Sequence, residues 1–177
     1  MKTLFSILIL ALATSSASAQ AGTTPTPPTA PDAACGSSEA QFDVKIDSGP
    51  RATAQAQDGK ALVYVVEDQQ FKFVKDVTVR VGLDGAWVGA NRGNSYLVFP
   101  VDPGEHHLCA DWMAAIGGRM LSLAKLNATA GKVYYFRART TGAKDERSAL
   151  DLEPVNSDEG GLLVSRAQPS ISSVKKK

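Results

Sequence analysis

The sequence predicts an all-β fold: an antiparallel β-sandwich, or a small barrel, of about eight strands with a short helix near the C-terminus. Three observations support this. Short stretches rich in β-branched and aromatic residues recur at close spacing, and turn residues separate them. Nowhere in the candidate domain is a helical periodicity sustained. The chain has 177 residues, 44% of them hydrophobic, which is enough for one core.

Composition divides the chain into four expected parts. Residues 1–19 are predicted to be a signal peptide, and residues 20–41 a flexible leader rich in Pro and Thr. Residues 42–166 are expected to form the β-sandwich domain, and residues 167–177 a disordered tail that ends in three lysines. A solvated tail is the favoured interpretation of those lysines, and attraction to an anionic surface is the alternative.

The signal peptide is predicted from its three regions. Lys2 gives a positive start, residues 4–13 form an apolar run, and Ala17-Ser18-Ala19 has the small-x-small pattern of a cleavage site. The alternative is a retained membrane anchor, but a run of about ten residues is half the length that a spanning helix needs. No other apolar stretch is long enough to cross a bilayer. We therefore expect an exported chain, periplasmic or secreted, with no transmembrane segment after cleavage.

The first strands are expected where apolar residues run together or alternate. Residues 42–46 form a plausible first strand, and residues 61–66 are a continuous apolar run that suits a central strand buried on both faces. In residues 77–83, valine and leucine alternate with other residues, as in a half-buried strand. Asp84-Gly85 supplies the positive φ of a tight hairpin, after which residues 86–89 return.

The next strands are separated by the clearest turn in the chain, Asp102-Pro103-Gly104-Glu105. Residues 95–101 precede it, with alternate apolar side chains on one face. Residues 106–112 follow it and place His106, Leu108, Ala110 and Trp112 on one face. If that face is turned toward the core, Cys109 points to the outer face of the sheet.

The last third of the sequence is less regular. Gly117-Gly118 interrupts a stretch whose composition suits a helix, so we favour a turn there and a strand over residues 119–127. Residues 133–140 are strong strand formers, and residues 150–152 are expected to form a short last strand. Ser157, followed by two acidic residues, is predicted to cap a short helix that reaches Arg166.

The two cysteines, Cys35 and Cys109, are expected to form one disulfide because we expect the chain to be exported. The bridge would hold the segment around Cys35 across the outer face of the sheet. Two free thiols are the alternative. A redox-active pair is disfavoured, because there is no Cys-x-x-Cys spacing.

Charge excludes one class of partner. The chain has 19 Lys and Arg against 18 Asp and Glu, and removal of Lys2 with the signal peptide balances them. Nucleic-acid binding normally requires a clustered basic surface, so no nucleic-acid partner is expected.

Enzymatic chemistry would have to use His106 or His107, the only histidines. Adjacent strand residues point to opposite faces, so the two cannot hold one metal ion without a bulge. Asp102, Glu105 and Asp111 are nearby carboxylates that could add oxygen ligands. We favour a structural interpretation, with His106 filling a core edge near the turn and His107 solvated. No catalytic, metal-binding or cofactor-binding residue is therefore assigned, and no cofactor is expected.

Five large amphipathic side chains could stack on a ligand or fill the core: Trp87, Tyr96, Trp112, Tyr134 and Tyr135. Such residues more often fill a sandwich core with the polar atom at its edge. We expect at least three of the five to be core residues.

An ordered set of short motifs also resembles a known family. The motifs are Gly59-Lys60-Ala61-Leu62-Val63-Tyr64-Val65, Leu83-Asp84-Gly85, Val88-Gly89, Asn94-Ser95-Tyr96, Pro103-Gly104-Glu105-His106 and Ala130-Gly131-Lys132-Val133-Tyr134-Tyr135. Together they resemble the bacterial domain-of-unknown-function family 2846 over residues 60–163, and the hairpin elements resemble PEGA-type modules. The resemblance implies a bacterial extracytoplasmic β-sandwich and transfers no catalytic residue. The chain departs from the family in lacking a lipidation cysteine and in having the cysteine pair.

The expected function is a non-enzymatic binding or structural role in the bacterial cell envelope, with a protein, a peptide or an envelope component as partner. Sandwiches of this kind act through loops and edge strands, to which an extended peptide can add itself. The end that bears Asp84-Gly85 and the loop at residues 90–94 is the candidate surface. Two alternatives stay open: a small secreted hydrolase or metal-dependent enzyme that uses His106 or His107, and a structural protein that self-associates.

Overall fold

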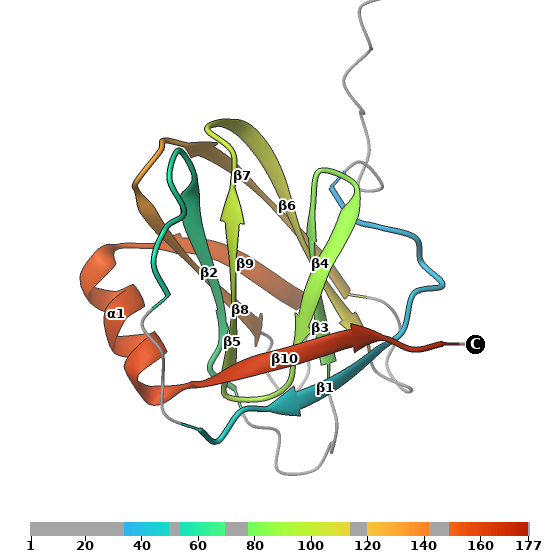
Figure 1. Ribbon diagram of the computed structural model, residues 1–177. Helices are drawn as coiled ribbons and strands as arrows, with labels where there is room; N and C mark the ends of the chain where they lie inside the picture. Colours follow the sequence, from blue (N-terminus) through green and yellow to red (C-terminus); the bar gives the residue numbers. More distant parts are fainter. Residues whose placement is uncertain (1–33, 50–53, 70–77, 114–119, 142–148, 177) are drawn as a thin grey trace, which may run out of the picture.

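The computed structural model describes residues 34–49, 54–69, 78–113, 120–141 and 149–176, which form two β-sheets and one helix (Figure 1). The all-β sandwich predicted from the sequence is confirmed, as two separate sheets rather than a closed barrel. The strands are β1 (Phe42–Ile46), β2 (Ala61–Glu67), β3 (Thr78–Leu83), β4 (Ala86–Asn91), β5 (Ser95–Val101), β6 (Gly104–Met113), β7 (Met120–Ala128), β8 (Val133–Thr141), β9 (Ala149–Val155) and β10 (Gln168–Val174). The helix is α1 (Ser157–Arg166).

The two sheets differ in size and in strand direction. The larger has six strands in the order β1-β10-β5-β2-β8-β9, and the smaller has four in the order β4-β3-β6-β7. Most neighbours are antiparallel, as predicted, but β10 pairs with β5, and β2 with β8, in parallel. In Figure 1, β1 and β10 run across β3 and β4 at a steep angle, so one end of the larger sheet wraps around the smaller.

The main core lies between the sheets. It takes one face of β2, with Val63 and Val65 fully buried, and one face of β6, with Leu108 and Ala110 fully buried. Every residue of β2 is buried, as predicted for a central strand. The reason is that its other face is covered too, by helix α1.

Helix α1 covers the outer face of the larger sheet. Tyr64 stacks on Tyr135 with ring centroids 5.2 Å apart, and Tyr96 lies on the other side of Tyr64 at 5.6 Å. The helix approaches closely because residue 160 is glycine: a Cβ there would lie 2.2 Å from Cγ of Tyr135. The N-cap is Asn156, one residue before the predicted Ser157, because its side chain accepts hydrogen bonds from two backbone N–H groups of the first turn.

Residues 168–174 form strand β10, so the prediction of a disordered tail over residues 167–177 is wrong there. This strand lies between β1 and β5 in the larger sheet, and Ala167 before it is fully buried. The segment Gln168–Val174 contains only two large apolar residues and four polar ones. Its strand structure comes from pairing with β1 and β5, which the local sequence does not indicate.

The prediction of a flexible leader over residues 20–41 is wrong for its last part, which packs against the domain. Residues 34–40, called the strap below, pack against the outer face of the smaller sheet, with Ala34 and Cys35 buried. Strand β3 is therefore buried on both faces, where the alternating pattern predicted a half-buried strand. Residues 1–19, the predicted signal peptide, and residues 20–33 lie outside the described residues.

The five large amphipathic side chains all pack against hydrophobic clusters. Tyr96 and Trp112 are buried, while Trp87, Tyr134 and Tyr135 are partly buried against the cores. Two of the five, Tyr96 and Trp112, are therefore buried core residues, and the other three stay partly exposed, with Tyr134 and Tyr135 lining a hollow beside β8 and β9.

Candidate functional site

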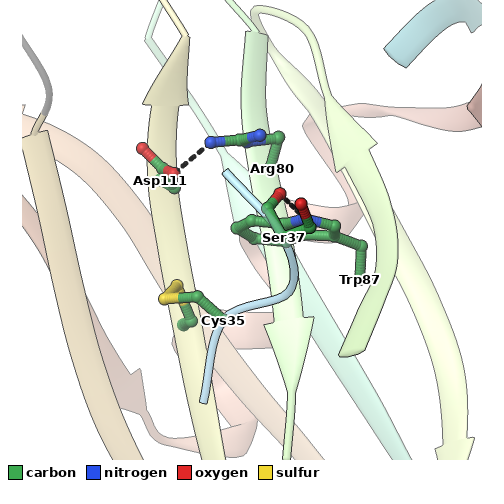
Figure 2. Close-up of a disulfide and its surroundings, with 6 residues drawn as sticks. Cys35, Ser37, Arg80, Trp87 and Asp111 are labelled. Atoms are coloured by element: carbon green, nitrogen blue, oxygen red, sulfur yellow. Dashed lines mark hydrogen bonds and ion pairs between the residues drawn. A yellow bond between two sulfur atoms is a disulfide. The ribbon is translucent and has the colours of Figure 1, made fainter. Parts of the chain in front are cut away.

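A disulfide joins Cys35 to Cys109, the pairing expected from the sequence, with the two Cα atoms 5.3 Å apart. Cys109 lies on the face of β6 opposite Leu108 and Ala110, which belong to the main core. It is nevertheless fully buried, because the strap covers it (Figure 2). The bridge therefore fixes the start of the strap to the outer face of the smaller sheet.

A buried ion pair holds the middle of the strap. Arg80 on β3 pairs with Asp111 on β6, and both side chains are almost wholly buried. Arg80 Nη1 also donates hydrogen bonds to the carbonyl oxygens of Ser38, at 3.1 Å, and Ala40, at 2.6 Å. Its guanidinium lies 4.3 Å from the ring centroid of Trp87. One cation thus connects two strands, an aromatic ring and the strap.

Trp87 holds the strap as well. Its Nε1 donates a hydrogen bond of 2.8 Å to the carbonyl oxygen of Ser37 (Figure 2). Two glycines make this close contact possible. A Cβ at Gly36 would lie 2.5 Å from the Trp87 ring, and one at Gly82 would lie 2.6 Å from the carbonyl oxygen of Ala34. The two glycines therefore let the strap lie directly on the Trp87 ring and on strand β3.

His106 connects two turns. Its Nδ1 lies 2.6 Å from Oδ2 of Asp84 in the β3–β4 turn, and its Nε2 lies 2.7 Å from the carbonyl oxygen of Asp102 in the β5–β6 turn. Asp84 Oδ1 also accepts a hydrogen bond from the backbone N–H of His107 at 2.8 Å. Both partners of the imidazole are acceptors, so both ring nitrogens donate when these bonds are made, as in the imidazolium form.

The His106–Asp84 contact shifts the pKa of both groups. Burial, the largest single influence on His106, lowers its pKa, but the hydrogen bonds to Asp84 and Asp102 and the nearby negative charges together outweigh it and raise the pKa. Burial likewise raises the pKa of Asp84, and the bonds from His106 and His107 outweigh it and lower the pKa. The contact therefore favours the charged form of both groups.

The carboxylates that could have joined a histidine site are engaged elsewhere. Asp102 pairs with Lys60 at 2.7 Å, Glu105 with Lys125 at 2.8 Å, and Asp111 with Arg80. Within the described residues, no group of three or more His, Cys, Asp and Glu side chains is placed to hold a metal ion. The structure places His106 at a core edge near the turns and leaves His107 exposed.

A buried carboxyl that the sequence analysis did not single out lies at one end of the core. Glu67, the last residue of β2, is only 1% exposed. Its Oε2 accepts a hydrogen bond from Gly93 N–H at 3.2 Å, and its Oε1 has no hydrogen-bond partner among the described residues. Asn91 is also fully buried, and its Nδ2 donates to the carbonyl oxygen of Val65 at 2.8 Å.

The environment of Glu67 raises the pKa of its carboxyl to about 8. Burial is the main cause, the Gly93 hydrogen bond opposes it, and the charge of Asp68 adds to it. The sequence does hold a signal for this residue. Glu67 continues the alternation of Ala61, Val63 and Val65, so a strand one residue longer than predicted turns its side chain toward the core.

Two open hollows mark the described surface. One, of about 270 Å³, lies beside β8 and β9 and is lined by Val133, Tyr134 and Pro154 among others. The second, of about 480 Å³, lies between the strap and the C-terminal residues Val174 and Lys175. Neither is lined by a histidine or a buried carboxyl group.

The loops of the candidate surface do not lie together. Asp84-Gly85 precedes β4 and residues 92–94 follow it, so the two turns lie at opposite ends of a six-residue strand. Such a strand is roughly 20 Å long. The single binding end predicted from the sequence is therefore wrong, because a hairpin strand separates its two loops.

The edge strands offer a more definite surface. At one seam between the sheets, Ser172 Oγ on β10 accepts a hydrogen bond from Ala90 N–H on the edge strand β4. At the opposite seam, Ser122 Oγ on β7 accepts one from Leu152 N–H on the edge strand β9. Three of the four sheet edges therefore lie at seams where the sheets meet. The fourth is β1, and no described strand pairs with its outer side.

The outer side of β1 carries a regular set of backbone groups. Lys175 N–H donates to Gln41 C=O at 2.8 Å, and Asp47 N–H donates to Pro169 C=O at 2.9 Å, so odd-numbered residues face β10. Hydrogen-bonding direction alternates along an antiparallel strand. The N–H and C=O groups of Phe42, Val44 and Ile46 therefore point away from β10. We call this set the β1 edge.

No family model, curated protein or solved structure matches this chain. No helix among the described residues has the length and apolar character needed to cross a membrane.

Proposed function

We propose that this protein is a non-enzymatic module of the bacterial cell envelope that works outside the cytoplasm and binds an extended protein segment along the β1 edge. The open backbone of Phe42, Val44 and Ile46 is the observation that carries the proposal. An extended segment that adds itself there gains main-chain hydrogen bonds and continues the larger sheet.

The disulfide supports the compartment. Bridges such as Cys35–Cys109 form and persist in the periplasm or outside the cell, and they are rare in the cytoplasm. The same bridge fixes the start of the strap, and hydrogen bonds from Arg80 and Trp87 hold the strap farther along. Export through a cleaved signal at residues 1–19 is consistent with the same location outside the cytoplasm.

The hydrogen bonds of the histidine support a role without catalysis. Both ring nitrogens of His106 are held by structural acceptors, and Asp102 and Asp111 are paired with cations. A general base needs a nitrogen that is free to take a proton from its substrate. In this arrangement His106 joins two turns.

The side chains of β1 suit partner binding. Phe42 and Val44 anchor the strand by packing against Ala90 and Trp87 of the smaller sheet. Asp43 and Lys45 stand on the exposed face. The backbone of β1 is therefore held rigidly from one side while its edge stays open, which lowers the entropy cost of strand addition.

Amide signals of β1 test the proposal directly. Extended peptides of alternating apolar and polar residues are titrated into the isotopically labelled protein, and NMR shifts and hydrogen exchange are recorded. We expect the amides of Phe42, Val44 and Ile46 to become protected, since these are the groups that face outward. Peptides that bind only elsewhere, or none that bind, would contradict the proposal.

A matched pair of variants separates backbone from side chain. Val44→Pro removes an outward N–H and leaves the bonds to β10 intact, a change that edge strands tolerate. Val44→Ala shortens the same side chain and keeps the N–H. We expect Val44→Pro to abolish peptide binding and Val44→Ala to retain it, with circular dichroism confirming that both fold.

A further inference from the structure

We infer that the segment that adds to the β1 edge is β1 of a second copy of this chain, paired antiparallel about a two-fold axis beside Val44. The inference rests on the proposed function and specifies its partner. It follows from the sequence of β1, Phe-Asp-Val-Lys-Ile, which is complementary to itself when reversed.

The backbone register is the first argument. In the two-fold arrangement Val44 faces Val44 of the second copy, and Phe42 faces Ile46 of the second copy. These three residues are the ones whose N–H and C=O groups point outward. All three opposing pairs thus fall at hydrogen-bonded positions of an antiparallel ladder. Every outward group of the β1 edge finds a partner without a shift or a bulge.

Charge is the second argument. The same register places Asp43 opposite Lys45 of the second copy, and the symmetry repeats this pair. Both side chains stand on the exposed face of β1, and the Asp43 side chain is 65% exposed although its Oδ1 also lies 3.4 Å from Nζ of Lys175 on the other side of the strand. Residues at non-hydrogen-bonded positions bring their side chains closest, and opposite charges there stabilise the pairing. A parallel pairing in direct register would instead place like charges side by side.

Apolar contact is the third argument. Ile46 is 38% exposed, although Phe42 and Val44 on the same face are buried. Pairing brings Ile46 of each copy beside Phe42 of the other, which removes apolar area from water. Aromatic and β-branched residues opposite each other are favourable cross-strand pairs.

The interface is small, because β1 has five residues. Contacts well below about 1,000 Å² are typical of transient association. We therefore expect a monomer–dimer equilibrium with a dissociation constant on the order of 10–1,000 µM, which local concentration in an envelope would favour.

Charge reversal tests the register. Sedimentation and small-angle scattering of the purified protein, with the Cys35–Cys109 disulfide formed, are measured across concentrations. Asp43→Lys or Lys45→Asp alone sets like charges opposite each other twice, and we expect the dissociation constant to rise about tenfold or more. The double variant Asp43→Lys/Lys45→Asp restores opposite charges between the copies and is expected to dimerise more tightly than either single variant, although it loses the Asp43–Lys175 ion pair within each copy. Lys132→Asp, at a turn away from β1, is the matched charge control.

Cysteine pairs provide a second, independent readout. A mixture of Asp43→Cys and Lys45→Cys proteins should form disulfide-linked heterodimers under mild oxidation, while each variant alone should cross-link far less. Equal cross-linking in all three samples would overturn the register. A chain that stays monomeric at about 1 mM would overturn self-pairing. Protection of the β1 edge by foreign peptides would then leave the proposed function standing, and its absence would remove both.

Discussion

At the scale of single residues, Glu67 is an acidic side chain buried in an otherwise apolar strand. A carboxyl at the end of a fully buried strand has one oxygen on Gly93 N–H and the other without a partner among the described residues. Burial disfavours the charged carboxylate, so the carboxyl keeps its proton up to a pKa of about 8.

Replacing Glu67 by Gln should change how stability depends on pH. Below the unfolded pKa of about 4.5 both states hold the proton, and Glu67 carries no penalty. Between there and about 8 only the folded state holds it, so stability falls by about 1.4 kcal/mol per pH unit. Glu67→Gln should be flatter over this window and more stable at pH 7 by roughly 1–3 kcal/mol. Denaturant unfolding of both proteins at several pH values measures the free energy of unfolding. The prediction is contradicted if that free energy depends on pH in the same way in Glu67→Gln as in the parent.

His106 should contribute in a different pH window. Its folded pKa is raised, so its contribution is fully present below the unfolded value near 6.5 and is lost as pH rises through the folded pKa. The pKa of Asp84 is lowered, so its contribution is present above its unfolded value near 3.8 and is lost as pH falls through the folded pKa. His106→Ala should therefore cost about 1–2 kcal/mol at pH 5.5 and less at pH 9. The exposed His107→Ala is the control, and an equal cost at both pH values in thermal melts would argue against this.

Single residues were only partly predictable. The position of His106 at a core edge follows from strand alternation, and so does the outward direction of Cys109. The Asp84 partner of His106 lies 22 residues away in the sequence, and only folding brings the two side chains together. The alternation over residues 77–83 predicts one solvated face for that strand, but Arg80 on this face is buried because the strap covers it.

At the scale of elements, the contact between α1 and the larger sheet predicts opposite effects for two neighbouring substitutions in the helix. Gly160 and Gly161 are neighbours in the same helix, and alanine is normally favoured over glycine there by about 1 kcal/mol. A Cβ at Gly160 would overlap Tyr135, whereas one at Gly161 meets nothing within 4 Å. Gly161→Ala should raise stability by about 0.5–1 kcal/mol and Gly160→Ala should lower it by about 1–3 kcal/mol. Equal effects in chemical denaturation would show that the helix does not dock as described.

The strap makes another prediction. Replacing both Cys35 and Cys109 by Ser opens a bridge between residues 74 apart in sequence, which should cost about 2–4 kcal/mol. Release of the strap should also uncover Trp87 and shift tryptophan fluorescence to longer wavelength. Denaturant melts of the variant against the oxidised parent give the cost. An unchanged midpoint and spectrum would mean that the strap holds without its bridge.

Elements with a clear local pattern were predictable, and those fixed by distant pairing were not. Strands at residues 42–46 and 95–101 match their predicted bounds, because apolar residues and turn residues mark both ends. Strand β10 was missed because its polar sequence suits a tail, and two neighbouring strands make it a strand. The N-cap was misplaced by one residue because Asn156 and Ser157 are both good caps.

For the whole molecule, two packed sheets follow from the sequence, but their strand order does not. The parallel pairings of β2 with β8 and of β10 with β5 join segments far apart in the chain. The order matters for function, because it decides which strand is left at an open edge. Serine hydrogen bonds join the edge strand β4 to β10 and the edge strand β9 to β7, while β1 is a short edge strand with alternating charge whose outer side no described strand pairs with.

Amide hydrogen exchange within β1, followed by NMR from dilute to concentrated protein, tests the open edge most directly. At low concentration we expect slow exchange at Asp43 and Lys45, which face β10, and fast exchange at Phe42, Val44 and Ile46. At high concentration the three fast amides should become protected. Protection of all five residues in the dilute protein would show that the β1 edge is already covered, and would contradict the account.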